Sequence, residues 1–271
     1  AGKLRGPYDH DVPVLAIRDA QLQLKTVVFG YACHSTVLSF TKWSGDYPGF
    51  AQIELERLYP GVDAIFWAGC GADQNPLPRR TVELAEQYGL RLARSVDSVL
   101  RGTLSPVAGE LISNYCEIPG KTQEPASREQ LEALLSTGNR YEIPFAKFLL
   151  RELGDENALP RVYPYPIQTW HIGDDLRMVF LGGEVVVDYA LQLKQSDSAG
   201  KRSKIWVAGY SNDVMAYIPS KRVLGEGGYE AGGSNVYYGF PALWSEDLEQ
   251  QILDEVRRQI GFTSMTRANE D

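Results

Sequence analysis

Two apolar runs on either side of an amphipathic segment constrain this fold more than any other feature of the sequence. The runs Leu22–Gly30 and Val62–Trp67 have the length and composition of buried strands. The segment Phe50–Leu58 between them has its apolar residues at helical spacing. A strand, a helix and a second strand in this order predict an α/β fold with a mixed β-sheet and flanking helices.

The same alternation of strands and helices continues along the chain. Val162–Ile172 and Leu176–Leu181 predict a hairpin across a Gly-Asp-Asp turn. Residues 225–239 are rich in glycine and contain three tyrosines, and we expect them to form a loop. The predicted helices are Thr81–Arg101, Glu184–Leu193 and Ser245–Ile260, the last with Ser245 as its N-cap, and the further strands are Val107–Ile118 and Ile205–Gly209.

Residues 119–160 differ from the rest of the chain because they are polar and charged. They contain two short helix-like pieces, Ser127–Leu135 and Phe145–Leu153. This pattern predicts either a small helical insertion, which could serve as a lid, or a plain surface connection. The polar residues 263–271 are expected to form a frayed tail.

The net charge and the small number of histidines and cysteines limit which partners and which kinds of metal site this chain can have. The 271 residues include 35 acidic and 27 basic side chains, and the net charge of −8 disfavours nucleic acid and anionic lipid as partners. No apolar run is long enough to cross a bilayer. The cysteines are too few and scattered for a zinc site, and we expect buried free thiols rather than a disulfide. Any metal site must recruit carboxylates or a less common ligand, because the only histidines and cysteines are His10, His34, His171, Cys33, Cys70 and Cys116.

Two polar segments directly follow predicted strands, where α/β proteins place their sites. The first is Ala-Cys-His34-Ser-Thr. His34 could bind a metal, act as a general base or, as the pattern alone favours, bond to the backbone in the core. The second is Gly71-Ala-Asp73-Gln-Asn75-Pro, which is neither a P-loop nor a dinucleotide fingerprint. Its backbone N–H groups could still face a developing oxyanion.

Two further segments have both a structural and a chemical interpretation. Ser44-Gly-Asp-Tyr-Pro-Gly49 predicts a turn followed by a helix start. Glu184 follows two glycines and is expected in the first turn of a helix, where the macrodipole favours an ionised carboxylate, a hard metal ligand. Simple helix capping is the strong alternative for Glu184. No Ser-His-Asp order, H-E-x-x-H motif or nucleophile elbow is present.

In this order, the segments resemble the neutral/alkaline, non-lysosomal ceramidase family. The similarity extends over nearly the whole chain and is closer to the shorter bacterial relatives. It depends on several motifs that occur in the same order as in the family, rather than on one decisive motif. These motifs are Phe29-Gly-Tyr-Ala-Cys-His34, Ser44-Gly-Asp-Tyr-Pro-Gly49, Gly71-Ala-Asp73-Gln-Asn75-Pro76, Gly183-Glu184, Gly209-Tyr-Ser-Asn212 and Gly228-Tyr229-Glu230.

The resemblance implies hydrolysis of the amide of N-acylsphingosine with one zinc ion, held by two histidines, a glutamate and a tyrosine. By motif, His34 resembles one of the family's histidines, Glu184 resembles its glutamate, and Tyr229 resembles the tyrosine of its late loop. A tyrosine ligand is physically reasonable, because a phenol with a pKa of about 10 in water is held as phenolate only beside a cation.

The sequence departs from the family pattern in two places. The stretch that carries the family's other histidine has no counterpart, so we expect residues 1–262 to be one ceramidase-like catalytic domain that lacks its N-terminal part. His10 matches no family ligand. When the loops are matched on Asp73, the family's catalytic serine corresponds to Asn75, which is no nucleophile. Asp73 or Asn75 would instead position an attacking water.

The sequence thus predicts a zinc-dependent amide hydrolase that acts on a small amphipathic N-acyl amide or lipid. Its metal ligands would be His34, Glu184 and Tyr229, and its catalytic residues Asp73 and Asn75. One alternative is a non-catalytic relative that binds a lipid, glycan or protein, which Asn75 favours. Another is a zinc hydrolase of a non-lipid amide or ester. A secreted or periplasmic location is implied by the resemblance alone.

Overall fold

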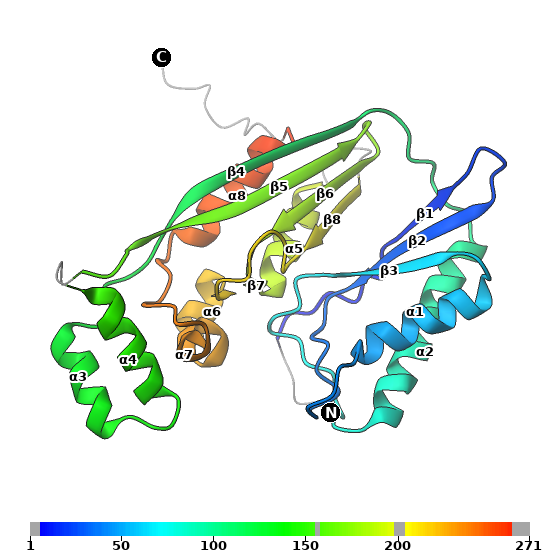
Figure 1. Cartoon of the computed structure of the whole chain (residues 1–271). Helices are drawn as coiled ribbons and strands as arrows, with labels where there is room; N and C mark the ends of the chain where they lie inside the picture. Colours follow the sequence, from blue (N-terminus) through cyan, green and yellow to red (C-terminus); the bar gives the residue numbers. More distant parts are fainter. Residues whose placement is uncertain (1–5, 155–157, 198–203, 262–271) are drawn as a thin grey trace, which may run out of the picture.

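The first sheet of the protein is built around the predicted strand–helix–strand unit (Figure 1). The structure is a computed structural model that describes residues 6–154, 158–197 and 204–261, so the predicted tail lies outside the described residues. In the sheet order β1-β2-β3, the first pair of strands is antiparallel and the second is parallel. The strands are β1 (Val14–Arg18), β2 (Leu24–Tyr31) and β3 (Asp63–Ala68), and the helices packed on this sheet are α1 (Asp46–Leu58) and α2 (Val82–Arg101).

The second sheet has four strands in the order β4-β5-β6-β8. The hairpin predicted across Gly173 is confirmed as the antiparallel pair of β5 and β6, and β8 joins β6 in parallel. Two helices pack against this sheet, and the described residues therefore form a mixed α/β structure as predicted. The strands are β4 (Leu111–Lys121), β5 (Val162–Ile172), β6 (Leu176–Leu181) and β8 (Lys204–Ala208), and the helices are α5 (Val187–Asp197) and α8 (Leu248–Gln259).

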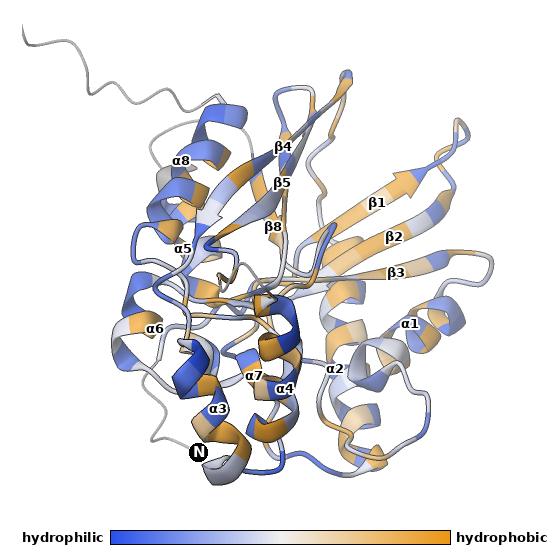
Figure 2. Ribbon diagram, turned by 60° about the vertical axis from the view of Figure 1, so that its left-hand side comes forward, coloured by the Kyte–Doolittle hydropathy of each residue, from blue (hydrophilic) through white to orange (hydrophobic). Residues whose placement is uncertain are grey.

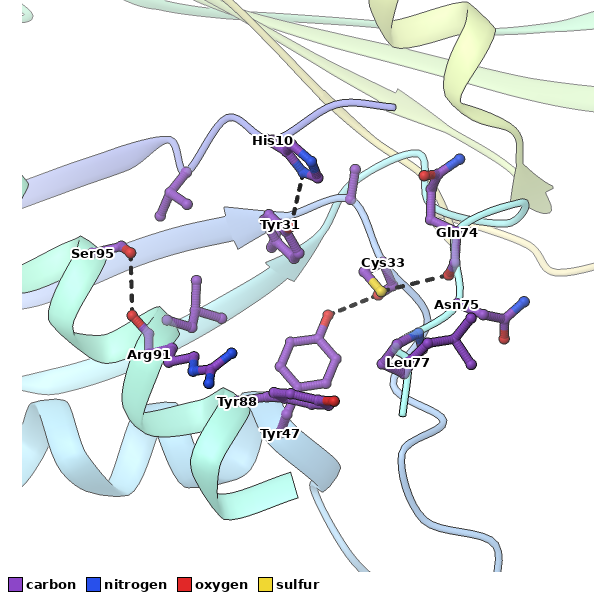
Figure 3. A pocket seen from close by; sticks show the side chains of 14 residues that line it. His10, Tyr31, Cys33, Tyr47, Gln74, Asn75, Leu77, Tyr88, Arg91 and Ser95 are labelled. Atoms are coloured by element: carbon purple, nitrogen blue, oxygen red, sulfur yellow. Dashed lines mark hydrogen bonds between the residues drawn. The ribbon is translucent and has the colours of Figure 1, made fainter. Parts of the chain in front are cut away.

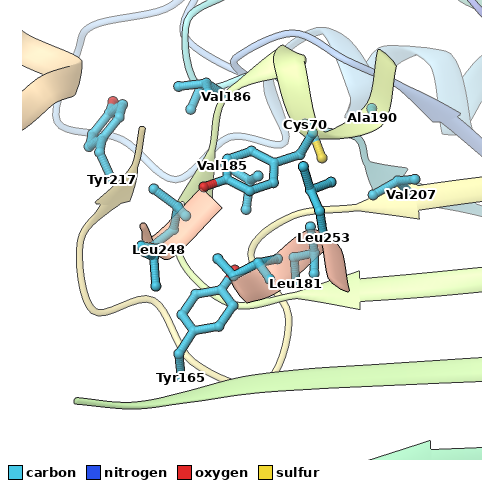
Figure 4. Packing of buried hydrophobic residues seen from close by; sticks show 14 of the residues in the cluster. Cys70, Tyr165, Leu181, Val185, Val186, Ala190, Val207, Tyr217, Leu248 and Leu253 are labelled. Carbon is cyan, nitrogen blue, oxygen red and sulfur yellow. The ribbon is translucent and has the colours of Figure 1, made fainter. Parts of the chain in front are cut away.

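Apolar packing joins these layers. Figure 4 shows the cluster beneath the second sheet, in which Tyr165 and Leu181 meet Leu248 and Leu253. In Figure 2 the strands of the first sheet are largely hydrophobic, whereas the visible side of α8 is largely hydrophilic. Aromatic rings fill the space between the two sheets, where Trp67 lies 4.5 Å from Phe180 and 5.0 Å from Trp206 between ring centroids. Aromatic pairs at these separations add to the stabilisation from burial alone.

Residues 119–160 contain the helical insertion that was one of two expectations. The helices α3 (Arg128–Thr137) and α4 (Glu142–Leu153) form a hairpin beyond one end of β4 and β5 (Figure 1). Ser127 begins α3 with a reciprocal capping box. The hairpin has a small core of its own, made of Leu131, Ala146, Leu149, Leu153 and Leu159.

Three local expectations were wrong. Residues 225–239 are a series of short helices rather than a loop. Glu184 lies in a two-residue strand, because Gly183 with a φ of 74° turns the chain before any helix begins, so the macrodipole argument does not apply. Ser245 does not cap α8, since its hydroxyl donates to the carboxylate of Asp247. The short elements are β7 (Glu184–Val185), β9 (Tyr217–Ile218), α6 (Lys221–Glu226), the π-helix η1 (Tyr229–Gly233) and α7 (Asn235–Tyr238).

Two expectations from composition can be compared with the structure. All three cysteines are free, and Cys70 is buried while Cys33 and Cys116 are partly exposed. Among the described residues, no helix is both long and apolar enough to span a membrane.

Candidate functional site

His34 lies in the loop after β2 and is held by the backbone around it. Its N–H donates to the carbonyl of Gln74 at 2.9 Å, and its ring Nε2 lies 2.8 Å from the carbonyl oxygen of Ala72. The buried carboxylate of Asp46 anchors the same loop by accepting the N–H of Leu38 at 2.8 Å. The backbone contact of a core histidine is therefore present, and it orients the ring.

The turn after β3 approaches the His34 loop so closely that one position requires glycine. A Cβ on Gly71 would lie 2.4 Å from the backbone nitrogen of Cys33. The N–H of Gln74 bonds the carbonyl of Gly71, and the N–H of Ala72 bonds a carbonyl of β7. These two amide groups are already paired and are therefore not available to an oxyanion.

Glu184 is placed by β7, which runs parallel to β9. In this register Glu184 pairs with Tyr217, so both side chains leave the same face of the two strands. The N–H of Glu184 donates to the carbonyl of Ala216 at 2.9 Å. The two-residue strand thus fixes the carboxylate beside a tyrosine from a distant part of the chain.

The side chains of His34 and Glu184 meet in a partly enclosed polar cluster. His34 Nδ1 lies 3.8 Å from Glu184 Oε2, and each side chain is only 13% exposed. The Tyr210 hydroxyl lies 3.2 Å from His34 Nδ1 and donates to Glu184 Oε2 at 3.0 Å. The Tyr217 hydroxyl lies 3.2 Å from His34 Nε2, and Tyr238 donates to Glu184 Oε1. We call these five side chains the His34 cluster.

Tyr210 reaches the cluster from an unusual backbone conformation. Its φ of 55° is in the left-handed region, which costs a residue with a Cβ about 1–2 kcal/mol. The N–H of Tyr210 bonds the carbonyl of Gly183 at 2.9 Å, and the next N–H, of Ser211, bonds the carbonyl of Leu181 at 3.0 Å. Strain of this kind persists only where the surroundings enforce it, and it gathers at functional sites.

The electrostatic environment keeps the phenols of the cluster protonated. Burial raises the pKa of Tyr210 and that of Tyr217, and the charge of Glu184 raises both further. Burial and the hydrogen bond to Glu184 also raise the pKa of Tyr238. A cation bound among these groups would lower the pKa values of the tyrosines and favour the phenolate form.

The His34 cluster contains two side chains of the types that zinc commonly takes as ligands, one imidazole and one carboxylate. The described residues contain no group of three or more His, Cys, Asp and Glu side chains that could hold a metal, so a metal here would also need phenol oxygens. Imidazole nitrogen and carboxylate oxygen are common zinc ligands, and a phenol beside a cation can supply a third. The bond from the His34 ring to Ala72 is of the kind that orients metal-binding histidines.

In the described part of the chain, neither Tyr229 nor His10 is hydrogen-bonded to the side chain of His34 or of Glu184. The Tyr229 ring packs on that of Tyr217 with centroids 5.4 Å apart, and the residue is 48% exposed. Burial and then the charge of Glu184 raise the pKa of Tyr229. The His10 ring lies 3.1 Å from the hydroxyl of Tyr31 instead.

Asp73 connects the turn after β3 to the rest of the fold. Its Oδ1 accepts the N–H of Val187, the first residue of α5, at 2.9 Å. Its Oδ2 lies 3.4 Å from the guanidinium of Arg222. These contacts give Asp73 a structural role, since it caps the start of α5 and pairs with Arg222.

Asn75 lies on the wall of a cavity of about 430 Å³ (Figure 3). Its Oδ1 accepts from Arg79 at 2.9 Å and from Thr36 at 3.4 Å. The cavity is not lined by His34 or Glu184, although Cys33, the neighbour of His34, does line it. Other side chains of the lining come from the N-terminal segment, β2, α1 and α2, and they include His10, Tyr31, Tyr47, Tyr88 and Arg91.

Three tyrosines of the His34 cluster were not predicted as site residues. Tyr210 belongs to a motif that the sequence comparison used, and its position directly after β8 was the signal that could have identified it. Tyr217 lies in a strand of two residues, which leaves no periodic pattern. Tyr238 was assigned to a loop and lies at the end of α7.

Comparison with known proteins gives a fold but no sequence family. No family model matches the chain, and no curated protein sequence matches it. Neutral ceramidase from Pseudomonas aeruginosa matches with a TM-score of 0.64 and 19% identity over 95% of this chain and 48% of that one. A ceramidase complexed with C2 matches with a TM-score of 0.63 and 18% identity over 97% of this chain and 50% of the other. The chain spans about half the length of these ceramidases, and at this identity the likeness is one of architecture. The chain therefore has a ceramidase-like α/β fold.

Proposed function

We propose that this chain carries a zinc-dependent amide hydrolase site. The observation that carries the proposal is the meeting of His34 and Glu184, 3.8 Å apart and shielded from solvent, in a ceramidase-like fold. A histidine and a carboxylate brought together at the ends of different strands are the arrangement in which α/β proteins build reactive centres.

The ligands that we propose are His34, Glu184 and Tyr217. Tyr217 is the register partner of Glu184, so its phenol lies beside that carboxylate, and burial followed by the carboxylate's charge raises the pKa of Tyr217. The geometry favours Tyr217 over the sequence-based candidate Tyr229, whose ring lies one packing layer further out. Tyr210 donates to Glu184 and would hold its carboxylate in place.

The chain's own groups would orient the substrate and supply protons. A bound zinc ion would polarise the amide carbonyl and acidify water. Tyr210 donates its one O–H to Glu184 in the metal-free chain, so it would supply a hydrogen bond to developing negative charge only where a bound zinc ion replaces that contact. Asn75 is no nucleophile, and its exposed amide would orient water or substrate at the cavity wall.

A small amphipathic N-acyl amide is the substrate class that we propose. Tyr229 and Tyr237 are half exposed beside the cluster and offer apolar ring surface to such a molecule. Phe240 and Trp244 are buried in the core and offer no such surface. Of the aromatic residues in this part of the chain, Tyr229 and Tyr237 are the exposed ones that present ring surface to solvent beside the cluster.

The test begins with zinc content by elemental analysis after dialysis. We expect near-stoichiometric zinc in the wild type, loss in His34→Ala, strong loss in Tyr217→Phe and retention in Tyr229→Phe. Hydrolysis of a short-chain fluorescent ceramide is then measured with and without a chelator. Wild-type protein without zinc would refute the metal site, and hydrolysis that the chelator leaves unchanged would refute its role in the reaction.

A second candidate function is binding without catalysis, and Asn75 is the observation that favours it. Its side-chain oxygen accepts from Arg79 and Thr36, and an amide cannot replace a serine nucleophile. Stoichiometric zinc together with saturable binding of the fluorescent ceramide, but no cleavage, would identify this function.

A further inference from the structure

α7 brings Tyr238 to Glu184, although a helix of four residues cannot hold its own position. Helices this short are unstable in isolation, because so few hydrogen bonds offset the cost of ordering the backbone. α7 has no side-chain cap at its N-terminus and ends at Gly239, with a φ of 70°. Its position therefore depends on the elements that pack against it.

The neighbour of α7 is α4 in the helical hairpin (Figures 1 and 2). The Phe148 ring covers Gly239 so closely that a Cβ there would lie 2.8 Å from its Cε1. The ring of Tyr141, just before α4, meets that of Tyr237 edge-on with centroids 5.1 Å apart. The hairpin thus contacts the residues on both sides of Tyr238.

The hairpin of α3 and α4 can hold α7 in place for two reasons. It has a buried core of its own, and the chain leading into it is hydrogen-bonded to the segment that follows α7. Leu131, Ala146 and Leu149 form its buried core. Just before α3, the N–H of Gln123 bonds the carbonyl of Leu243 at 2.8 Å, a few residues after α7. The hairpin therefore meets the chain around α7 from two directions.

The hydrogen bond from Tyr238 holds one oxygen of the Glu184 carboxylate. Tyr238 donates to Oε1 of Glu184, whereas Oε2 is the oxygen 3.8 Å from His34 Nδ1. A donor held on one oxygen restricts rotation of the carboxylate, so the other oxygen stays directed at His34. Outer hydrogen bonds of this kind orient metal-binding groups in many sites.

We propose that α4 is a positioning element of the His34 cluster. Phe148 and Tyr141 hold α7 in place and thereby hold the hydrogen bond from Tyr238 to Glu184. The proposal rests on the proposed function only in treating Glu184 as a metal-binding carboxylate. The positioning itself exists without metal and is tested separately.

The first test measures amide hydrogen exchange of residues 229–243 in the full, metal-free chain. We expect Phe148→Ala to exchange about threefold faster or more in this segment, with Phe148→Leu restoring most of the protection. Leu135→Ala, a similarly exposed position on α3, is the matched control and should leave the segment unchanged. Equal exchange in the wild type and Phe148→Ala would overturn the proposal.

The second test is a double-mutant cycle on the zinc dissociation constant. We expect Phe148→Ala and Tyr238→Phe each to weaken binding by about tenfold, the scale of lost orienting contacts. The double variant should bind as weakly as Tyr238→Phe alone, because both changes remove the same bond. Independent, multiplying losses would overturn the proposal. Absence of zinc from the wild type would refute the proposed function, while the exchange result would still decide the positioning role.

Discussion

In the part of the chain that the structure describes, two groupings bring a histidine together with tyrosines, and they differ in whether a carboxylate is hydrogen-bonded to the phenols. Beside the cavity, the His10 ring stacks on Tyr8 with centroids 4.4 Å apart and contacts the Tyr31 hydroxyl. In the His34 cluster, the histidine and the tyrosines also surround the carboxylate of Glu184. We call the first grouping the His10 group.

The remaining tyrosines of the cavity show what this difference means. The Tyr47 hydroxyl donates to the carbonyl of Cys33, and that of Tyr88 donates to the carbonyl of Pro78. Phenols bonded to backbone carbonyls hold loops together. Phenols that converge on a carboxylate and an imidazole form instead a set whose protonation responds to a cation. The carboxylate distinguishes the candidate site from a structural cluster of similar composition.

The largest effect is expected from removing the charge that distinguishes the two groupings. Glu184→Gln should weaken zinc binding by more than about 100-fold, because it removes a ligand rather than an orienting contact. His10→Ala, at the corresponding histidine beside the cavity, should leave zinc binding unchanged. Competition with a chelating dye measures both. Equal losses in the two variants would place the metal elsewhere and break the comparison.

Stability at the turn between the two regions gives the next effect. Asp73→Ala removes the acceptor at the start of α5 and a partner of Arg222, so we expect a loss of about 1–2 kcal/mol in the free energy of unfolding. Asn75→Ala, two residues away and exposed, should change it by less than about 0.5 kcal/mol. Urea denaturation measures both. A reversed order of the two losses would contradict the anchoring role of Asp73.

The dependence of stability on alkaline pH distinguishes a tyrosine of the His34 cluster from a tyrosine exposed to water. Burial and the charge of Glu184 raise the pKa of Tyr210 above its ordinary value of 10.0, so the native state keeps a proton that the unfolded chain releases. The stabilisation is complete below pH 10.0 and is lost as the pH rises beyond it. Tyr210→Phe should therefore flatten this decline by up to about 1.4 kcal/mol per pH unit. Urea denaturation measures the free energy of unfolding of the wild type and of Tyr210→Phe between pH 9 and pH 11. Parallel curves for the two proteins would contradict a raised pKa for Tyr210.

The smallest effect concerns the thiol on the cavity wall. Burial, followed by the charge of Asp46, raises the pKa of Cys33 to about 12, so little thiolate exists at pH 8. A disulfide reagent should react slowly with the native chain and rapidly with all three thiols in denaturant. Cys33→Ser should leave the slow native reaction unchanged. A rapid native reaction that disappears in this variant would show that the cavity wall opens.

Much of the fold was predictable because the longer elements leave a periodic pattern. The core-facing residues of α2 recur at helical spacing, and Thr81 caps the helix by accepting the N–H of Leu84. The hairpin of β5 and β6 was predictable from its strands and its turn. Elements as short as β7 and α7 carry no such pattern, which is why Glu184 was expected in a helix and Tyr238 in a loop.

The candidate site was predictable only in part. His34 and Glu184 were identified by residue type and motif, and the structure brings them together. Asp73 was identified from the same motif, yet its contacts are those of an anchor. Sequence similarity pointed to Tyr229, whereas the tyrosines that contact His34 are Tyr210 and Tyr217.

The sequence by itself determined the alternation of strands and helices, since burial of an apolar face is encoded in the spacing of neighbouring residues. Only the tertiary structure decided which polar groups converge. His34 and Tyr217 are 183 residues apart in the chain, yet their side chains touch. The reason is physical: the His34 cluster as a whole depends on the register of β7 and β9, on the left-handed turn at Tyr210 and on the packing of α4 against α7, and none of these is recorded in a local pattern.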